Sequence, residues 1–113
     1  MTLATLLYPP PTKRGMDEWA YANVQHHRAL NSAILRRRNI SIGETQIWPI
    51  RQDSFQDFLR QHQQWHDALN GALGVAGVDL QNVDFTNDKE RDAWIWLHFN
   101  SHRNYAEALG GGV

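Results

Sequence analysis

The chain has 113 residues, of which 42% are hydrophobic and 20% are charged, and its formal net charge is −1. This length suits one domain with a modest core, and the charge gives no general attraction to nucleic acid or to an acidic membrane surface. Because the sequence contains no cysteine, disulfides, thiolate metal sites and cysteine nucleophiles are excluded.

Residues 1–15 are predicted to form an extended N-terminal arm. Three consecutive prolines remove backbone donors and favour a polyproline-like path. The apolar run before them is too short for a membrane span and lacks the charge order of a secretory signal, so we expect a soluble chain without a membrane partner. The arm is apolar enough to contact a partner, and its candidate partner-binding residues are Leu6, Leu7, Tyr8, Pro9 and Pro10.

Residues 16–113 are predicted to form a single helical domain, whose first helix runs from Met16 or Asp17 to about Arg38. Inward positions recur every three or four residues. They are Met16, Ala20, Asn23, Val24, His27, Leu30, Asn31 and Ile34. Three arginines at residues 36–38 suit the negative end of this helix dipole. That interpretation is favoured over a basic nucleic-acid-binding face, because the chain as a whole is not basic.

The segment 39–52 loses the helical period. It has β-branched residues around Gly43, and Pro49 forbids a central position in a sheet. A short hairpin and an ordered loop packed across the helices fit this segment equally well.

Two further helices are predicted after this segment. The second begins at Asp53 with a capping arrangement and ends near Leu73, before Gly74 or Gly77, and the third follows a cap at Asn87. Three glycines stop the third helix after about residue 109. The inward residues of the second helix are Phe55, Phe58, Leu59, His62, Trp65, His66, Leu69 and Leu73. Those of the third are Trp94, Ile95, His98, Ser101, His102, Tyr105 and Leu109. The predicted fold class is therefore all-α, a small bundle of three main helices.

The third helix is apolar on more than one side. At the ideal rotation per residue, Trp96 lies about 160° from His98 and Phe99 about 100° from it. A helix that is apolar on opposite sides must be covered on both. Trp96 and Phe99 are therefore further candidate partner-binding residues.

A short internal repeat links the three helices. The stretches "HRALNSAI", "HDALNGAL" and "HRNYAEAL" begin at His27, His66 and His102 and align without gaps. The repeat indicates that three helices pack in the same way, and an ancestral duplication is a second explanation.

Five of the six histidines fall on the inward faces, and two interpretations of them remain open. They are His27, His62, His66, His98 and His102. In the first, two pairs spaced by four residues, His62 with His66 and His98 with His102, bind zinc or another transition metal. In the second, the inward His, Asn, Ser, Tyr and Trp side chains form a neutral hydrogen-bond network without a cofactor. The network is favoured because no carboxylate lies on the inward faces, whereas iron sites in bundles ordinarily include one.

No catalytic motif is found. The serines lack a nucleophile elbow, and no glycine-rich loop lies between a strand and a helix to hold phosphate. We therefore expect a non-enzymatic protein.

The stretch from Phe58 to Gly110 carries a family resemblance. It reads "FLRQHQQWHDALNGALGVAGVDLQNVDF" and then "AWIWLHFNSHRNYAEALG". The order of a histidine-containing helix, a G-x-D-L-x-x-V-D-F loop and a W-x-W-L-H-x-x-x-H helix resembles small helical proteins encoded among the virion structural genes of tailed bacteriophages. The resemblance covers about half the chain.

This resemblance implies a structural subunit of a virion, at the neck, the tail or the head-tail junction. Its partners would be other virion proteins and copies of itself, and it would lie in the host cytoplasm before assembly. The motifs identify no catalytic residue.

Overall fold

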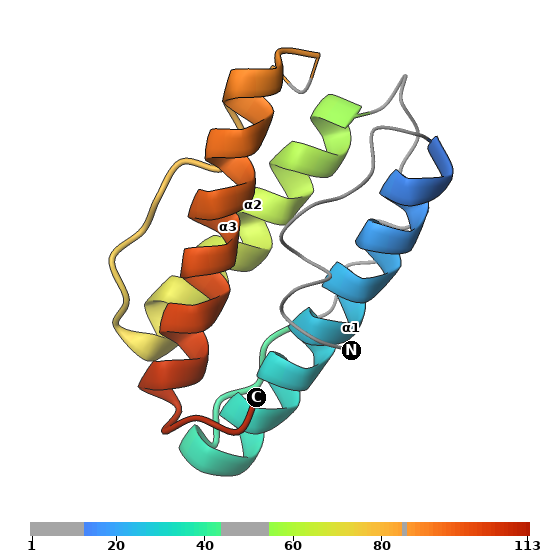
Figure 1. Cartoon of the computed structure of the whole chain (residues 1–113). Coiled ribbons are helices and arrows are strands. Elements are labelled where there is room, and N and C mark those ends of the chain that lie inside the picture. Colours follow the sequence, from blue (N-terminus) through green and yellow to red (C-terminus); the bar gives the residue numbers. More distant parts are fainter. Residues whose placement is uncertain (1–12, 44–54, 85) are drawn as a thin grey trace.

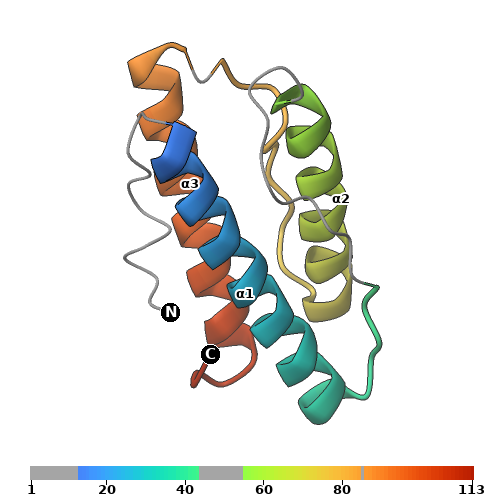
Figure 2. The same cartoon turned by 90° about the vertical axis from the view of Figure 1, so that its right-hand side faces the viewer.

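The computed structural model describes residues 13–43, 55–84 and 86–113. It contains the helices α1 (Lys13–Arg38), α2 (Phe55–Leu73) and α3 (Asp88–Ala108), and the described residues form no strand. The predicted all-α bundle of three helices is confirmed. All three helices run in the same direction along the bundle (Figures 1 and 2), so each connection must return the chain from one end to the other. The direction of the helices was not part of the prediction.

Several predicted features lie outside the described residues. These are the arm candidates Leu6, Leu7, Tyr8, Pro9 and Pro10, the Asp53 cap, the segment 44–52, and the side chains of Met16, Ala20 and Phe55. The start of α1 differs from the prediction, because Lys13 to Gly15 are already helical. Lysine and arginine are good helix formers, so the helix extends back past the first clearly periodic residue.

The ends of α2 and α3 follow the predicted glycines. Gly74 has a φ of 67° and Gly110 a φ of 89°, the left-handed conformation that ends many helices. In α3, Gly111 N donates to Ala106 O and Gly110 N to Glu107 O, which satisfies the last carbonyls. At the other end, the Asn87 side chain accepts from the backbone amides of residues 89 and 90, so the predicted cap is confirmed.

The parallel helices stack their inward residues in five layers, each with one residue from each helix. Counted from the amino-terminal end, the layers are Trp19, Phe58, Trp94; Asn23, His62, His98; His27, His66, His102; Leu30, Leu69, Tyr105; and Ile34, Leu73, Leu109. In every helix the steps between layers are four, four, three and four residues. The internal repeat of the sequence is therefore a structural one, since its three leading histidines share the third layer.

Two apolar clusters enclose the histidine layers. The cluster at the amino-terminal ends contains Trp19, Val24, Phe58, Leu59, Trp65, Leu80, Trp94 and Ile95. The cluster at the carboxyl-terminal ends contains Leu30, Ala33, Ile34, Leu69, Tyr105 and Leu109. Water is thus excluded from both sides of the middle layers.

The connection from α2 to α3 is held to the bundle by Leu80, which is fully buried. The Gln63 side chain accepts from Leu80 N at 2.5 Å, and Trp94 Nε1 donates to Leu80 O at 2.8 Å. Both backbone groups of this buried loop residue are therefore satisfied, as burial requires. The G-x-D-L part of the loop motif thus has a structural explanation.

Two of the three arginines at the end of α1 bind the end of α3. Arg37 donates to the carbonyls of Leu109 and Gly111, and Arg38 donates to Ala108 O, each at 2.7 Å. They cap a neighbouring helix because the parallel arrangement brings both carboxyl ends together. None of the described helices is both long and apolar enough to cross a membrane.

Candidate metal centre

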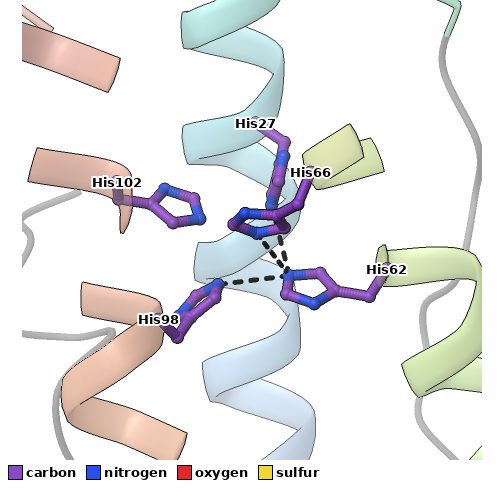
Figure 3. Close-up of side chains that lie close together, drawn as sticks. All are labelled: His27, His62, His66, His98 and His102. Atoms are coloured by element: carbon purple, nitrogen blue, oxygen red, sulfur yellow. Dashed lines mark hydrogen bonds between the residues drawn. The ribbon is translucent and has the colours of Figure 1, made fainter. Parts of the chain in front are cut away.

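Five imidazoles converge in the middle of the bundle. His27, His62, His66, His98 and His102 each place a ring nitrogen so that all five nitrogens lie within 4.8 Å of one another. All five side chains are at most 2% exposed. Figure 3 shows His62 and His98 at one level and the other three rings at the next, which are the second and third layers.

One nitrogen has three close neighbours. His62 Nε2 lies 3.1 Å from His66 Nε2, 3.1 Å from His98 Nε2 and 3.3 Å from His27 Nε2. A nitrogen of a neutral imidazole either donates or accepts one in-plane hydrogen bond, so three such contacts cannot all be hydrogen bonds. Nitrogens held about 2.1 Å from one metal ion are about 3.0 Å apart at right angles and about 3.4 Å apart at tetrahedral angles. The observed separations lie in this range.

Burial keeps these imidazoles in the form that binds metals. It lowers the pKa of all five, that of His62 to about 3, because the charged form is poorly solvated in the core. Repulsion from neighbouring imidazoles lowers the pKa of the other four further. At neutral pH the rings are therefore uncharged, with lone pairs available.

Tyr105 and Asn70 orient one of the rings. His66 Nδ1 lies 3.0 Å from the Tyr105 hydroxyl, which in turn donates to Asn70 Oδ1 at 2.5 Å. The tyrosine proton is used on Asn70, so His66 Nδ1 must carry the hydrogen and donate it. His66 Nε2 is then left with its lone pair toward His62, the tautomer typical of metal-bound histidine.

The sixth histidine, His26, also lies beside this cluster, although its sequence position did not predict it. His26 is 5% exposed, and its Nδ1 lies 2.5 Å from His102 Nδ1. This contact leaves His102 Nε2 for the cluster, and Figure 3 shows one nitrogen of that ring directed toward His66. His26 escaped the prediction because it lies beside His27 and off the stripe of apolar positions. The contact between His26 and His102 depends on the directions of α1 and α3, which the sequence pattern does not state.

The described residues form part of the predicted polar network, through contacts among the histidines, Tyr105 and Asn70. Ser101 Oγ donates to Leu97 O within its own helix, and Trp94 Nε1 donates to Leu80 O in the loop. Neither of these hydrogen bonds is made to a histidine. Tyr105 alone of the predicted Ser, Tyr and Trp partners has a hydrogen bond to a ring of the cluster among the described residues. Buried nitrogen and oxygen atoms with no hydrogen-bond partner in the described part of the chain include Asn23 Nδ2 and Oδ1, His26 Nε2, His62 Nδ1, His98 Nδ1 and His102 Nε2. A network this incomplete would be costly in a core.

The structure also shows where the other predicted site residues lie. Trp96 is 47% exposed, as its place opposite His98 implies, and Phe99 is half-buried with its ring against Trp96 at a centroid separation of 6.0 Å. Coverage of these two side chains by a partner stays a prediction. The four predicted metal ligands His62, His66, His98 and His102 are brought together, and His27 joins them.

Comparison with known proteins gives no relative for this chain. No protein-family model, no curated protein and no solved structure matches it. The chemistry of the site therefore carries the functional argument.

Proposed function

We propose that this protein is a metal-binding helical bundle, with one first-row transition-metal ion held between the three helices by buried imidazoles. The observation that carries the proposal is the position of His62 Nε2, 3.1–3.3 Å from three other imidazole nitrogens. Only a shared ligand partner gives all four nitrogens a favourable contact at once. The ion would stabilise the fold, because all its ligands come together only when the helices pack.

The ring positions favour six-coordinate geometry over the four-coordinate geometry of structural zinc. With ring centres about 3.2 Å from an ion, adjacent rings of an octahedron are about 4.5 Å apart and opposite rings about 6.4 Å. The centroids of His27 and His98 are 6.5 Å apart, whereas eight of the other nine pairs of rings in the cluster are separated by 4.3–5.2 Å. Imidazole donors in an octahedral arrangement suit Fe(II), Co(II) or Ni(II).

Metal analysis of the untagged protein tests the proposal. Chain prepared without a histidine tag, stripped with chelator and reloaded, should retain one ion per chain after gel filtration. His62→Leu should lose the ion, because it removes the nitrogen with three neighbours. Leu69→Ala is the matched control, since it also truncates a buried α2 residue but should keep the metal. Wild-type protein that retains no Fe(II), Co(II), Ni(II) or Zn(II) would refute the proposal.

The sequence resemblance supports a second, compatible candidate, a structural subunit of a tailed-phage virion. A metal that ties the helices together would suit a small subunit with a modest core. The exposed aromatic surface of α3 at Trp96 supports a contact with another protein. Particle-associated chain that is released by Trp96→Ala would support this candidate, and unchanged incorporation of that variant would count against it.

A further inference from the structure

One position of the two histidine layers is not a histidine. The second layer consists of Asn23, His62 and His98, and the third of His27, His66 and His102. Two parallel layers of three side chains around one axis supply the six corners of an octahedron. Five corners are imidazoles, and the sixth belongs to Asn23.

Asn23 lies in this layer by its spacing and by its neighbours. It is one helical turn from both Trp19 and His27, and the ring centroids of these two residues lie 5.5 Å and 6.5 Å from that of His98. The Asn23 side chain is 0% exposed, and both of its polar atoms are without a hydrogen-bond partner in the described residues. A buried amide in this state requires a partner, because desolvation of an unpaired polar group is costly.

The asparagine side chain is too short to act as the imidazoles do. Its polar atoms are one bond closer to the backbone than the Nε2 of a histidine at an equivalent position. Since His62 and His98 reach the centre with Nε2, an asparagine in the same layer stops short of it by about one bond length. The amide then ends about 3.4 Å from the metal position, so a small ligand held by both would lie beside the line that joins them.

The position of this ligand follows from the pairing of opposite corners. His27 of α1 lies across the centre from His98 of α3, as their 6.5 Å separation indicates. Advancing each by one helix under the threefold arrangement pairs His66 of α2 with Asn23 of α1. The corner at Asn23 therefore lies opposite His66, the ring that Tyr105 orients.

We infer that the centre keeps one coordination position for a small exogenous ligand, water or hydroxide, which Asn23 binds by hydrogen bonds and which small anions can replace. This inference rests on the proposed metal site. The five imidazoles are neutral ligands and the cluster contains no carboxylate, so a divalent ion would keep its full charge in an apolar core. An anion at the sixth position lowers that charge, and Asn23 Nδ2 can donate to it.

Azide binding to the Co(II)-loaded full chain tests the inference. Co(II) reports its ligands through visible absorption, and azide is a small anion able to replace water. Wild-type protein should bind one Co(II) and change its spectrum on titration with azide. Asn23→His should keep the metal and lose the azide response, because a sixth imidazole fills the corner. Asn104→His is the control, since it adds a histidine at an exposed site on α3 and should respond as wild type does.

Asn23→Leu tests the hydrogen bond from the amide to the bound ligand separately from the volume that the side chain fills. It keeps a side chain of similar size, so the metal should remain bound while azide affinity falls about tenfold. Failure of the wild type to bind Co(II) would overturn the proposed function and this inference together. Stoichiometric Co(II) without an azide response would overturn the inference alone, as would an azide affinity unchanged in Asn23→Leu. The wild-type and Asn23→Leu titrations decide the matter even if Asn23→His does not fold.

Discussion

The third and fourth layers of the bundle occupy equivalent positions on the same three helices but reach stability differently. Leu30, Leu69 and Tyr105 fill the fourth layer in contact with a continuous apolar cluster. The third layer packs three imidazoles whose centroids are 4.6–5.1 Å apart. Burial alone favours the apolar layer, whereas the histidine layer gains only when its nitrogens find a partner. The contrast supports the proposal that the middle of this bundle binds a metal ion.

Metal removal should have the largest effect on this contrast. With free metal about a thousandfold above the dissociation constant, binding should add about 4 kcal/mol to the free energy of unfolding. Urea unfolding with and without a chelator measures this difference. A metal that binds stoichiometrically but leaves the unfolding curve unchanged would lie outside the core.

Truncation of the apolar layer should give the converse result. Leu30 is fully buried, so Leu30→Ala should lower the free energy of unfolding by about 3 kcal/mol while metal stoichiometry stays at the wild-type value. His98→Leu should abolish metal binding while changing the stability of the metal-free protein by less than about 1 kcal/mol, because leucine removes the unpaired His98 Nδ1 from the core. A large loss of stability in metal-free His98→Leu would favour the hydrogen-bond network over the metal.

Sequence periodicity predicted the inner faces well and their assembly poorly. All seven inward residues predicted for α3 are buried. Trp, Ile and Tyr at three- and four-residue spacing lie on one helix face, and packing that face against the bundle removes them from water. Which helix residues meet depends on helix direction, and no local signal in the chain states it. The matching repeats at His27, His66 and His102 were the available clue, since equal spacing in three helices aligns in layers only if the helices are parallel.

Asn23 illustrates the same limit. Its place on the α1 stripe was predicted, but its equivalence to His62 and His98 is a property of the layer. The partners available to the predicted hydrogen-bond network also depend on the fold. Ser101 and Trp94 can form hydrogen bonds by residue type, but in the structure Ser101 donates to its own helix and Trp94 donates to the loop at Leu80.

Acid should destabilise the metal-free protein through the same histidines. Burial holds their folded pKa values below the unfolded value near 6.5, that of His62 at about 3. Below pH about 6.5 the unfolded chain binds protons that the folded chain does not, so stability is fully present above that pH and falls as the pH drops. The slope should approach about 1.4 kcal/mol per pH unit for each such proton.

Urea unfolding at a series of pH values measures this slope. His98→Leu, which has one buried imidazole fewer, should have a shallower slope than wild type. Stability that does not change between neutral pH and pH about 5 would mean that the cluster is already charged or exposed.

Loss of the Tyr105 hydroxyl should have a smaller effect. Tyr105→Phe keeps the apolar fourth layer but leaves His66 Nδ1 without its acceptor. The metal-free protein should lose about 1 kcal/mol, and metal affinity should fall about tenfold or more. Competition with a chromophoric chelator measures the affinity. An unchanged affinity would mean that Tyr105 orients no ligand.

The smallest effect on stability is expected on the outer face of α3. Because Trp96 is 47% exposed, Trp96→Ala should change the free energy of unfolding by no more than about 0.5 kcal/mol and should leave metal binding intact. If this face contacts another copy of the chain, sedimentation velocity should show weaker self-association in the variant. Leu35→Ala is the control, because Leu35 is 51% exposed on α1 and lies outside the predicted interface. A loss of stability comparable to that of Leu30→Ala would assign Trp96 to the core, and self-association equal in both variants would remove the interface from α3.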